Sequence, residues 1–183
     1  MRISFTGPGC SGKTTLLKKC QEHYGDEFEY VEEVTRPALK EGMKINEDGD
    51  NKTQLYVLAE HLKNDKLDNV IMDRCIIDGF VYTTWLHMER KVDESVLNAY
   101  TKVYSQLIDN LDIVFACKPV KLEDDGERST DSEFIEGVKK VFENVVRLEH
   151  QFSKVSIIYL EGDVETRFND IKIAIQKHER TSR

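Results

Sequence analysis

Several features that would indicate a membrane, secreted or zinc-binding protein are scarce in this 183-residue chain. No apolar run approaches the roughly 20 residues that a membrane-spanning helix needs, so we expect no membrane association. The four cysteines are scattered without the spacing of a zinc site and suit a reducing cytoplasm. Because the first residues already resemble a strand, we expect no signal peptide and a cytoplasmic location.

Positively charged residues are also fewer than negatively charged ones. The chain has 26 Lys and Arg residues against 34 Asp and Glu residues, for a formal net charge of −8. This balance argues against a broad surface that coats nucleic acid, but it leaves room for a local basic cleft. The five histidines have neither metal-ligand spacing nor a serine arrangement typical of a catalytic triad, so we interpret them as structural. Length and composition favour a single globular domain over residues 1–183.

One motif organises the rest of the chain. A short apolar strand at residues 3–6 is followed by Gly-Pro-Gly-Cys-Ser-Gly-Lys-Thr at residues 7–14, which matches the phosphate-binding loop pattern. Its glycines let the backbone turn tightly and bring N–H groups against phosphate oxygens. Lys13 can reach the β- and γ-phosphates of ATP, and the Thr14 hydroxyl can bind Mg²⁺. The residues predicted to bind the ATP phosphates are Gly7, Gly9, Cys10, Ser11, Gly12, Lys13, Thr14 and Thr15.

Strand and helix patterns alternate along the whole chain. Strands are predicted at residues 3–6, 28–34, 70–73, 113–117 and 155–160, with helical patterns between and after them. Such alternation predicts an α/β fold of three layers, in which helices cover both faces of a five-stranded parallel sheet. Ligands bind beyond the carboxyl ends of the strands in these sheets. The phosphate loop and residues 32–36, 73–78 and those after 117 should therefore share one cleft.

Some local predictions are more detailed. We expect Pro37 to break regular structure after the second strand, and Thr53 to cap a helix. That helix should turn Leu55, Leu58, Ala59 and Leu62 inward, and the helix predicted over residues 134–152 should bury Val138, Val141, Val145 and Leu148.

Two acidic segments compete for the role of general base. Asp73 ends an apolar strand, where a carboxylate can hold Mg²⁺ or accept a proton from an attacking hydroxyl, and Arg74 beside it can bind a phosphate or acceptor. Alternation along the second strand turns Glu32 and Glu33 to opposite faces, so one of them should reach the cleft as an alternative base. Arg36 follows as a second candidate for binding the acceptor.

A polar segment at about residues 119–131 is a candidate lid. It contains Asp124-Asp125-Gly126-Glu127-Arg128-Ser129, and an arginine on a closing loop can neutralise charge on a transferred phosphoryl group. We therefore include Arg128 among the catalytic candidates.

Taken in order, these motifs resemble the NadR-like AAA-domain family of P-loop kinases. The resemblance rests on the phosphate loop, on Glu33-x-x-Arg36, on Asp73-Arg74 with Asp78, and on the residues around Arg128. This family is related to a ribosylnicotinamide kinase domain and is often phage-encoded, in which case the chain would act in the host cytoplasm. The resemblance implies Mg-ATP as donor, Lys13 and Thr14 on the donor side, Asp73 and Arg74 on the acceptor side, and Arg128 as a lid arginine. We include Asp78 with Arg36 and Arg74 among the candidates for binding the acceptor.

The predicted activity is transfer of the ATP γ-phosphoryl group to a small nucleoside or nucleotide. A hydroxyl acceptor would need Asp73 or Glu33 as base, whereas a monophosphate acceptor would instead be bound by Arg36 and Arg74. Two alternatives stay open: a kinase that acts on a modified base hydroxyl in DNA, and a regulatory NTPase that uses hydrolysis as a switch. The sequence leaves the oligomeric state undecided, with a homodimer as one option.

Overall fold

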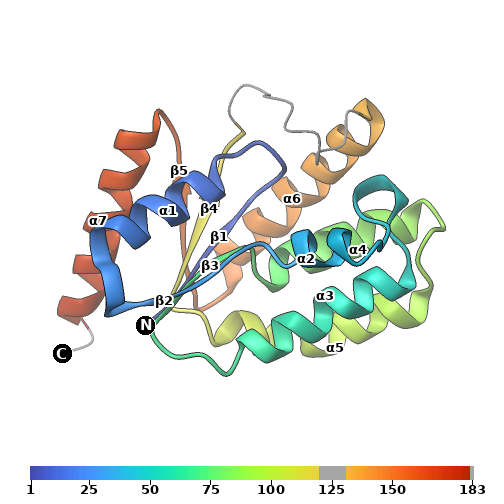
Figure 1. The fold of residues 1–183 in the computed structure, drawn as a ribbon, viewed down its shortest axis with the longest axis horizontal. Helices are drawn as coiled ribbons and strands as arrows, with labels where there is room; N and C mark the ends of the chain where they lie inside the picture. The colour runs from blue at the N-terminus through green and yellow to red at the C-terminus, as the bar shows by residue number, and fades with distance from the viewer. Residues whose placement is uncertain (120–130, 182–183) are drawn as a thin grey trace.

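The computed structural model describes residues 1–119 and 131–181, which form an α/β structure with a five-stranded parallel sheet (Figure 1). The strand order is β2-β3-β1-β4-β5. The strands are β1 (Arg2–Thr6), β2 (Glu29–Val31), β3 (Val70–Asp73), β4 (Ile113–Cys117) and β5 (Ser156–Leu160). The predicted fold class is confirmed, although β2 is shorter than the sequence pattern indicates, because Glu32 and the residues after it leave the sheet.

Helices α1 (Lys13–Tyr24) and α7 (Val164–Thr181) cover one face of the sheet (Figure 1). Alternate strand residues point to this face, among them Ile3, Phe5 and Phe115. They pack against Leu16 of α1 and Ile171 of α7. Because α1 begins at Lys13, within the phosphate-loop motif, this packing anchors the loop to the centre of the sheet.

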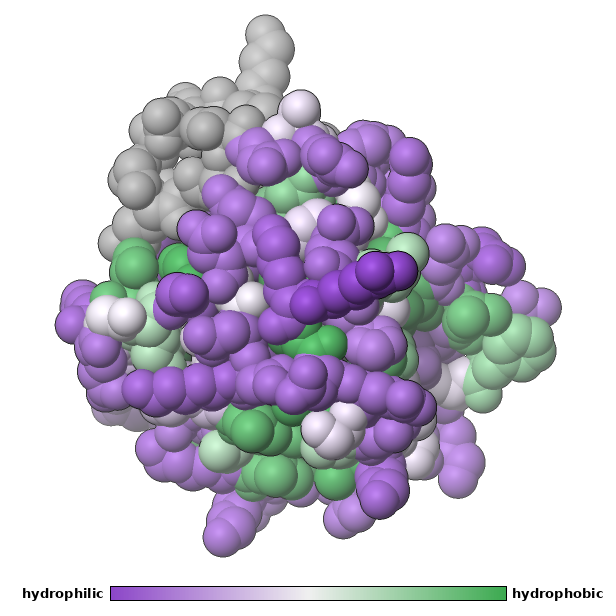
Figure 2. Space-filling model, turned by 90° about the vertical axis from the view of Figure 1, so that its right-hand side faces the viewer, coloured by the Kyte–Doolittle hydropathy of each residue, from purple (hydrophilic) through white to green (hydrophobic). Residues whose placement is uncertain are grey.

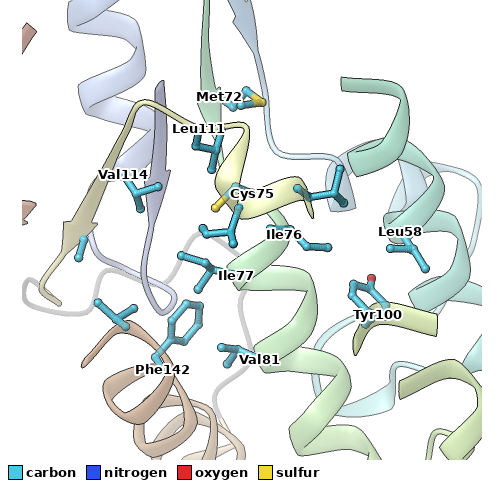
Figure 3. Packing of buried hydrophobic residues seen from close by; sticks show 14 of the residues in the cluster. Leu58, Met72, Cys75, Ile76, Ile77, Val81, Tyr100, Leu111, Val114 and Phe142 are labelled. Atoms are coloured by element: carbon cyan, nitrogen blue, oxygen red, sulfur yellow. The ribbon is translucent and has the colours of Figure 1, made fainter. Parts of the chain in front are cut away.

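The opposite face is covered by α3 (Asn51–Asn64), α4 (Ile76–Met88), α5 (Glu94–Asp109) and α6 (Ser132–Phe152) (Figure 1). Helix α4 lies at the centre of this layer: Ile77 and Val81 are buried among residues of the sheet and of α6, including Val114 and Phe142 (Figure 3). Tyr100 of α5 is fully buried in the same cluster. The start of α4, which follows Asp73 and Arg74, is thus held rigidly.

Short helical elements join β2 to α3: α2 (Thr35–Lys40) and the 3-10 turn Asn46–Asp48, while another 3-10 turn, Gly25–Glu27, precedes β2. The prediction that Pro37 breaks regular structure is wrong, since Pro37 lies in the first turn of α2. Proline is tolerated there because the first N–H groups of a helix have no intrahelical acceptor. The predicted cap is wrong too: Asp50 caps α3 by accepting from the Thr53 N–H.

Two predicted apolar stripes are partly wrong. On α3, Leu58 is buried but Leu55 and Leu62 are exposed, and on α6 Val138 is buried whereas Leu148 is exposed. Polar residues of α3 such as Gln54 and His61 take the buried positions instead. Figure 2 shows a largely hydrophilic face on which hydrophobic residues form small separate groups. No helix in the described part of the chain is both long and apolar enough to span a membrane.

Candidate active site

The phosphate loop connects β1 to α1 and contains backbone conformations that favour glycine. Gly7 has φ +143°, and a Cβ there would lie 2.5 Å from the carbonyl oxygen of Cys117 at the end of β4. Gly12 has φ +78° and precedes α1 as its N-cap. The loop is therefore packed closely against the neighbouring strand and leads into a helix N-terminus, where free N–H groups favour an anion.

Lys13 folds back over the loop that precedes it. Its Nζ donates to the carbonyl oxygens of Gly7 (3.0 Å) and Pro8 (2.9 Å) and to the Ser11 hydroxyl (3.0 Å). Burial lowers the pKa of Lys13, and the nearby Arg74 guanidinium lowers it further, while carboxylates including Asp73 act in the opposite direction. The ammonium group thus lies against the loop in which phosphate oxygens are expected.

Thr14 and Asp73, the two residues predicted to bind Mg²⁺, are in direct contact. Thr14 Oγ1 donates to Asp73 Oδ2 over 2.6 Å. Burial raises the pKa of Asp73, opposed by Lys13 and Arg74. Asp73 Oδ1 is buried and has no hydrogen-bond partner among the described residues. A hydroxyl and an unsatisfied carboxylate oxygen fit Mg²⁺, which takes oxygen ligands from one or two side chains and from nucleotide phosphates.

Arg74, which follows β3, is bonded to Glu33, which follows β2. Its Nε donates to Glu33 Oε1 over 2.6 Å, and its Nη1 donates to Asp78 Oδ1 over 2.9 Å. Burial by itself raises the pKa of Glu33, but Arg74, Lys13 and the Thr35 hydroxyl outweigh that effect and lower it to about 2. Glu33 is therefore ionised at neutral pH and held in one orientation.

The backbone at Arg74 is strained. Its φ of +81° is unfavourable for a residue with a Cβ, at a cost on the order of 1–3 kcal/mol. Its N–H extends the β1–β3 pairing by donating to the Phe5 carbonyl (2.9 Å), and its side chain is held by Glu33 and Asp78. These interactions hold the backbone of Arg74 in this conformation and offset its cost in free energy.

Asp78 lies deeper than its predicted acceptor-binding role requires. It is 2% exposed, and Oδ2 accepts from Thr6 Oγ1 (2.8 Å) and from the Cys75 N–H (3.1 Å) at the start of α4. Its contacts hold Arg74 in place and tie α4 to β1, and its side chain does not line the cleft.

A cleft of about 450 Å³ opens beside the phosphate loop. Its polar end contains Lys13, Glu33, Arg36 and Arg74, so the structure brings the predicted acceptor residues Arg36 and Arg74 and the candidate base Glu33 to the phosphate loop, whereas neither Asp73 nor Asp78 lines the cleft. Glu32 is exposed, as expected if only one glutamate of this pair reaches the cleft. The apolar part of the cleft comes from α2, the segment after it, α4 and α6, through Leu39, Ile45, Tyr82, Phe134, Ile135 and Val138.

Two residues beside the phosphate loop and the cleft escaped the sequence analysis. Tyr82 lies under Arg74, with the guanidinium 5.4 Å from the ring centroid, and forms an aromatic wall with Phe134. Arg167 of α7 is buried and donates to the Ser11 carbonyl in the phosphate loop. Both residues lie in ordinary amphipathic helix patterns, which carry no signal of their position beside the loop. The predicted lid arginine, Arg128, lies outside the described residues.

Comparison with known protein families shows to which family the chain belongs. The model of the AAA domain family matches residues 2–167, which is most of the chain. The chain belongs to this AAA domain family. The family membership inferred from the phosphate loop and the acidic motifs is thereby confirmed. No match to this AAA domain was found among curated protein sequences.

Solved structures share the fold of this AAA domain at low sequence identity. A deoxyadenosine kinase from M. mycoides, with dCMP and a flexible dCDP bound as products, has a TM-score of 0.75 and 20% identity, over 97% of this chain and 99% of its own. NadR protein in complex with NR has a TM-score of 0.72 and 16% identity, over 96% of this chain and 50% of NadR. YorR protein from Bacillus subtilis, in complex with phosphorylated GDP, has a TM-score of 0.57 and 16% identity, over 97% of each chain.

Proposed function

We propose that this AAA domain is a kinase that transfers the γ-phosphoryl group of Mg-ATP to a hydroxyl group of a nucleoside-type acceptor. The observation that carries the proposal is the position of Glu33, an ionised carboxylate that lines the cleft beside the phosphate loop. The solved structures with similar folds include a deoxyadenosine kinase with deoxynucleotides bound, which supports the acceptor class.

The donor side binds the triphosphate. The loop N–H groups and the start of α1 supply hydrogen bonds and a favourable dipole for phosphate oxygens. Lys13, whose ammonium group lies against the loop, neutralises charge on the β- and γ-phosphates. Thr14 and Asp73 would hold Mg²⁺, which when bound neutralises charge on the phosphate oxygens.

The two competing carboxylates receive different roles in this proposal. Asp73 bonds to Thr14 and belongs to the metal side, whereas Glu33 lines the cleft and faces the acceptor. Arg74 and Thr35 both bond to Glu33 Oε1, so Oε2 is the atom left for the acceptor hydroxyl. A weakly basic carboxylate suffices because the transition state of phosphoryl transfer is loose, and orientation of the hydroxyl matters more than base strength.

A hydroxyl acceptor is favoured over a monophosphate by the contacts of Arg74. Both Glu33 and Asp78 bind its guanidinium, so it is less able to bind an acceptor phosphate. The apolar wall formed by Tyr82, Phe134 and their neighbours suits a flat heterocyclic base. Arg36 lines the same cleft and would contact the sugar or an anionic part of the acceptor.

The test is a screen for acceptor-dependent ADP release with Mg-ATP. Nucleosides, deoxynucleosides, their monophosphates and nicotinamide riboside are compared, and we expect strong stimulation by one nucleoside class. Glu33→Gln should then lower kcat by about 10²–10⁴-fold with unchanged ADP affinity, whereas the exposed Glu32→Gln serves as the matched control. Stimulation only by monophosphates would replace the hydroxyl acceptor with a phosphate. Slow turnover independent of every acceptor would favour a switch NTPase instead.

A further inference from the structure

Arg167 connects three loops at the carboxyl end of the sheet. It lies in the first turn of α7, is only 4% exposed, and its Nη1 donates to the carbonyl oxygens of Ser11 (2.9 Å) and Lys118 (3.1 Å). Its Nε donates to the carbonyl oxygen of Gly162 (2.9 Å). These three residues follow β1, β4 and β5 respectively, so one side chain holds the phosphate loop to the two neighbouring loops.

The positive charge of Arg167 has an unusual environment. Within residues 1–119 and 131–181, its hydrogen bonds all go to backbone carbonyl oxygens, and it forms no ion pair with a carboxylate. A buried charge without a counter-charge is costly unless other groups compensate for it. The carbonyl dipoles compensate in part, and a polyphosphate bound on the other side of the loop would supply the negative charge that is missing.

One peptide group lies between the hydrogen bond from Arg167 to the Ser11 carbonyl oxygen and the expected phosphate site. The Ser11 carbonyl and the Gly12 N–H belong to the same trans peptide group, so the N–H points away from Arg167. A charged donor on the carbonyl polarises the unit and makes its N–H a stronger donor. Gly12 lines the cleft and precedes α1, where phosphate oxygens are expected.

We infer that Arg167 is a positioning residue for the donor nucleotide: it fixes and polarises the Ser11–Gly12 peptide so that Gly12 binds the phosphate oxygens more tightly. The inference rests on the proposed function in one respect, that the loop binds a nucleoside polyphosphate. Arg167 itself touches neither phosphate nor acceptor. Its removal should therefore weaken donor binding and leave acceptor binding unchanged.

The experiment compares Arg167→Gln with Arg2→Gln as a matched control. Arg2 is also largely buried and bonds to Asp65 over 2.7 Å, but it lies at the amino end of β1, away from the phosphate loop. ADP affinity is measured by calorimetry, and the melting temperature of each nucleotide-free protein is recorded. We expect Arg167→Gln to weaken ADP binding about tenfold or more, and Arg2→Gln to leave it unchanged.

A conservative variant and kinetics separate positioning from simple stabilisation. Arg167→Lys keeps the charge but cannot span the three carbonyl oxygens, so its ADP affinity should lie between those of the wild type and Arg167→Gln. The KM for ATP should rise from the wild type to Arg167→Lys and rise further in Arg167→Gln, while the KM for the acceptor stays constant. If Arg167→Gln does not fold, the comparison of Arg167→Lys with the wild type carries the test.

The outcomes are distinguishable. The folded Arg167 variants could have lower melting temperatures but the same ADP affinity as the wild type. That result would show that Arg167 only stabilises the fold, and it would overturn the inference. Tight ADP binding by the wild type in that same experiment would leave the proposed function intact. A wild-type protein that binds no ADP would overturn the proposed function itself, and this inference with it.

Discussion

Arg74 Nε and Glu33 Oε1 lie 2.6 Å apart, although the two residues are 41 positions apart in the chain. The contact exists because β2 and β3 are neighbours in the sheet and both end at the cleft. It keeps Glu33 ionised, and in the proposed function the second carboxylate oxygen receives the acceptor hydroxyl. Asp78 holds Arg74 from the other side at 2.9 Å, so the guanidinium is fixed between two carboxylates.

The pair makes the stability of the fold depend on pH. The pKa of Glu33 is about 2 in the folded protein against an ordinary value of 4.5, so its contribution is fully present above about pH 4.5 and is lost as the pH falls towards 2. Unfolding free energies of the wild type and Glu33→Gln, measured by denaturant from neutral pH down to about pH 3, should converge as the pH falls. A difference between the two that stays constant over this range would contradict the assigned pKa.

Lys13 should be essential for phosphoryl transfer. Lys13→Ala removes the ammonium group that lies against the loop, and we expect at least about a hundredfold loss of phosphoryl transfer with a retained fold. Lys18→Ala is the matched control, because Lys18 is exposed on the same helix. ADP release and circular dichroism provide the two readouts. Near-wild-type turnover by Lys13→Ala would remove the loop from the mechanism.

Two glycines of the phosphate loop should respond differently to the same change. In Gly7→Ala the new Cβ would meet the Cys117 carbonyl oxygen at 2.5 Å, so we expect destabilisation on the order of 2 kcal/mol or more and impaired ADP binding. At Gly9 nothing lies within 4 Å of an added Cβ, so Gly9→Ala should change the stability by less than about 1 kcal/mol. Thermal unfolding with and without ADP measures both effects. Equal stability of the two variants would show that the close packing of the loop is unimportant.

Arg128 remains a prediction from the sequence motif. If it acts on the transferred phosphoryl group, Arg128→Ala should lower kcat more than ATP affinity. Steady-state kinetics and direct ATP binding are compared, with Lys121→Ala as a control from the same polar segment. An equal loss in rate and affinity would make Arg128 a residue that binds ATP in the ground state.

The sequence predicted the phosphate loop, the five strands and the parallel fold, because these depend on local patterns. Glycine spacing defines a turn, and runs such as Val70–Asp73 can satisfy their backbone groups and bury their side chains only inside a sheet. Helix faces were harder to predict. Leu55 and Leu62 fit an apolar stripe, yet α3 buries Gln54 and His61 because α4 and α5 pack on that side.

Which charged groups meet was decided by the tertiary structure. The sequence placed the four charged residues near strand ends: Glu33, Asp73, Arg74 and Asp78. Only the strand order β2-β3-β1-β4-β5 brings Glu33 into contact with Arg74, and Asp73 into contact with Thr14. The same packing turns Asp78 inward and brings Arg167 from the last helix to the loop at the start of the chain. Local residue patterns set which elements form, whereas long-range burial and pairing of charges set which side chains share the cleft.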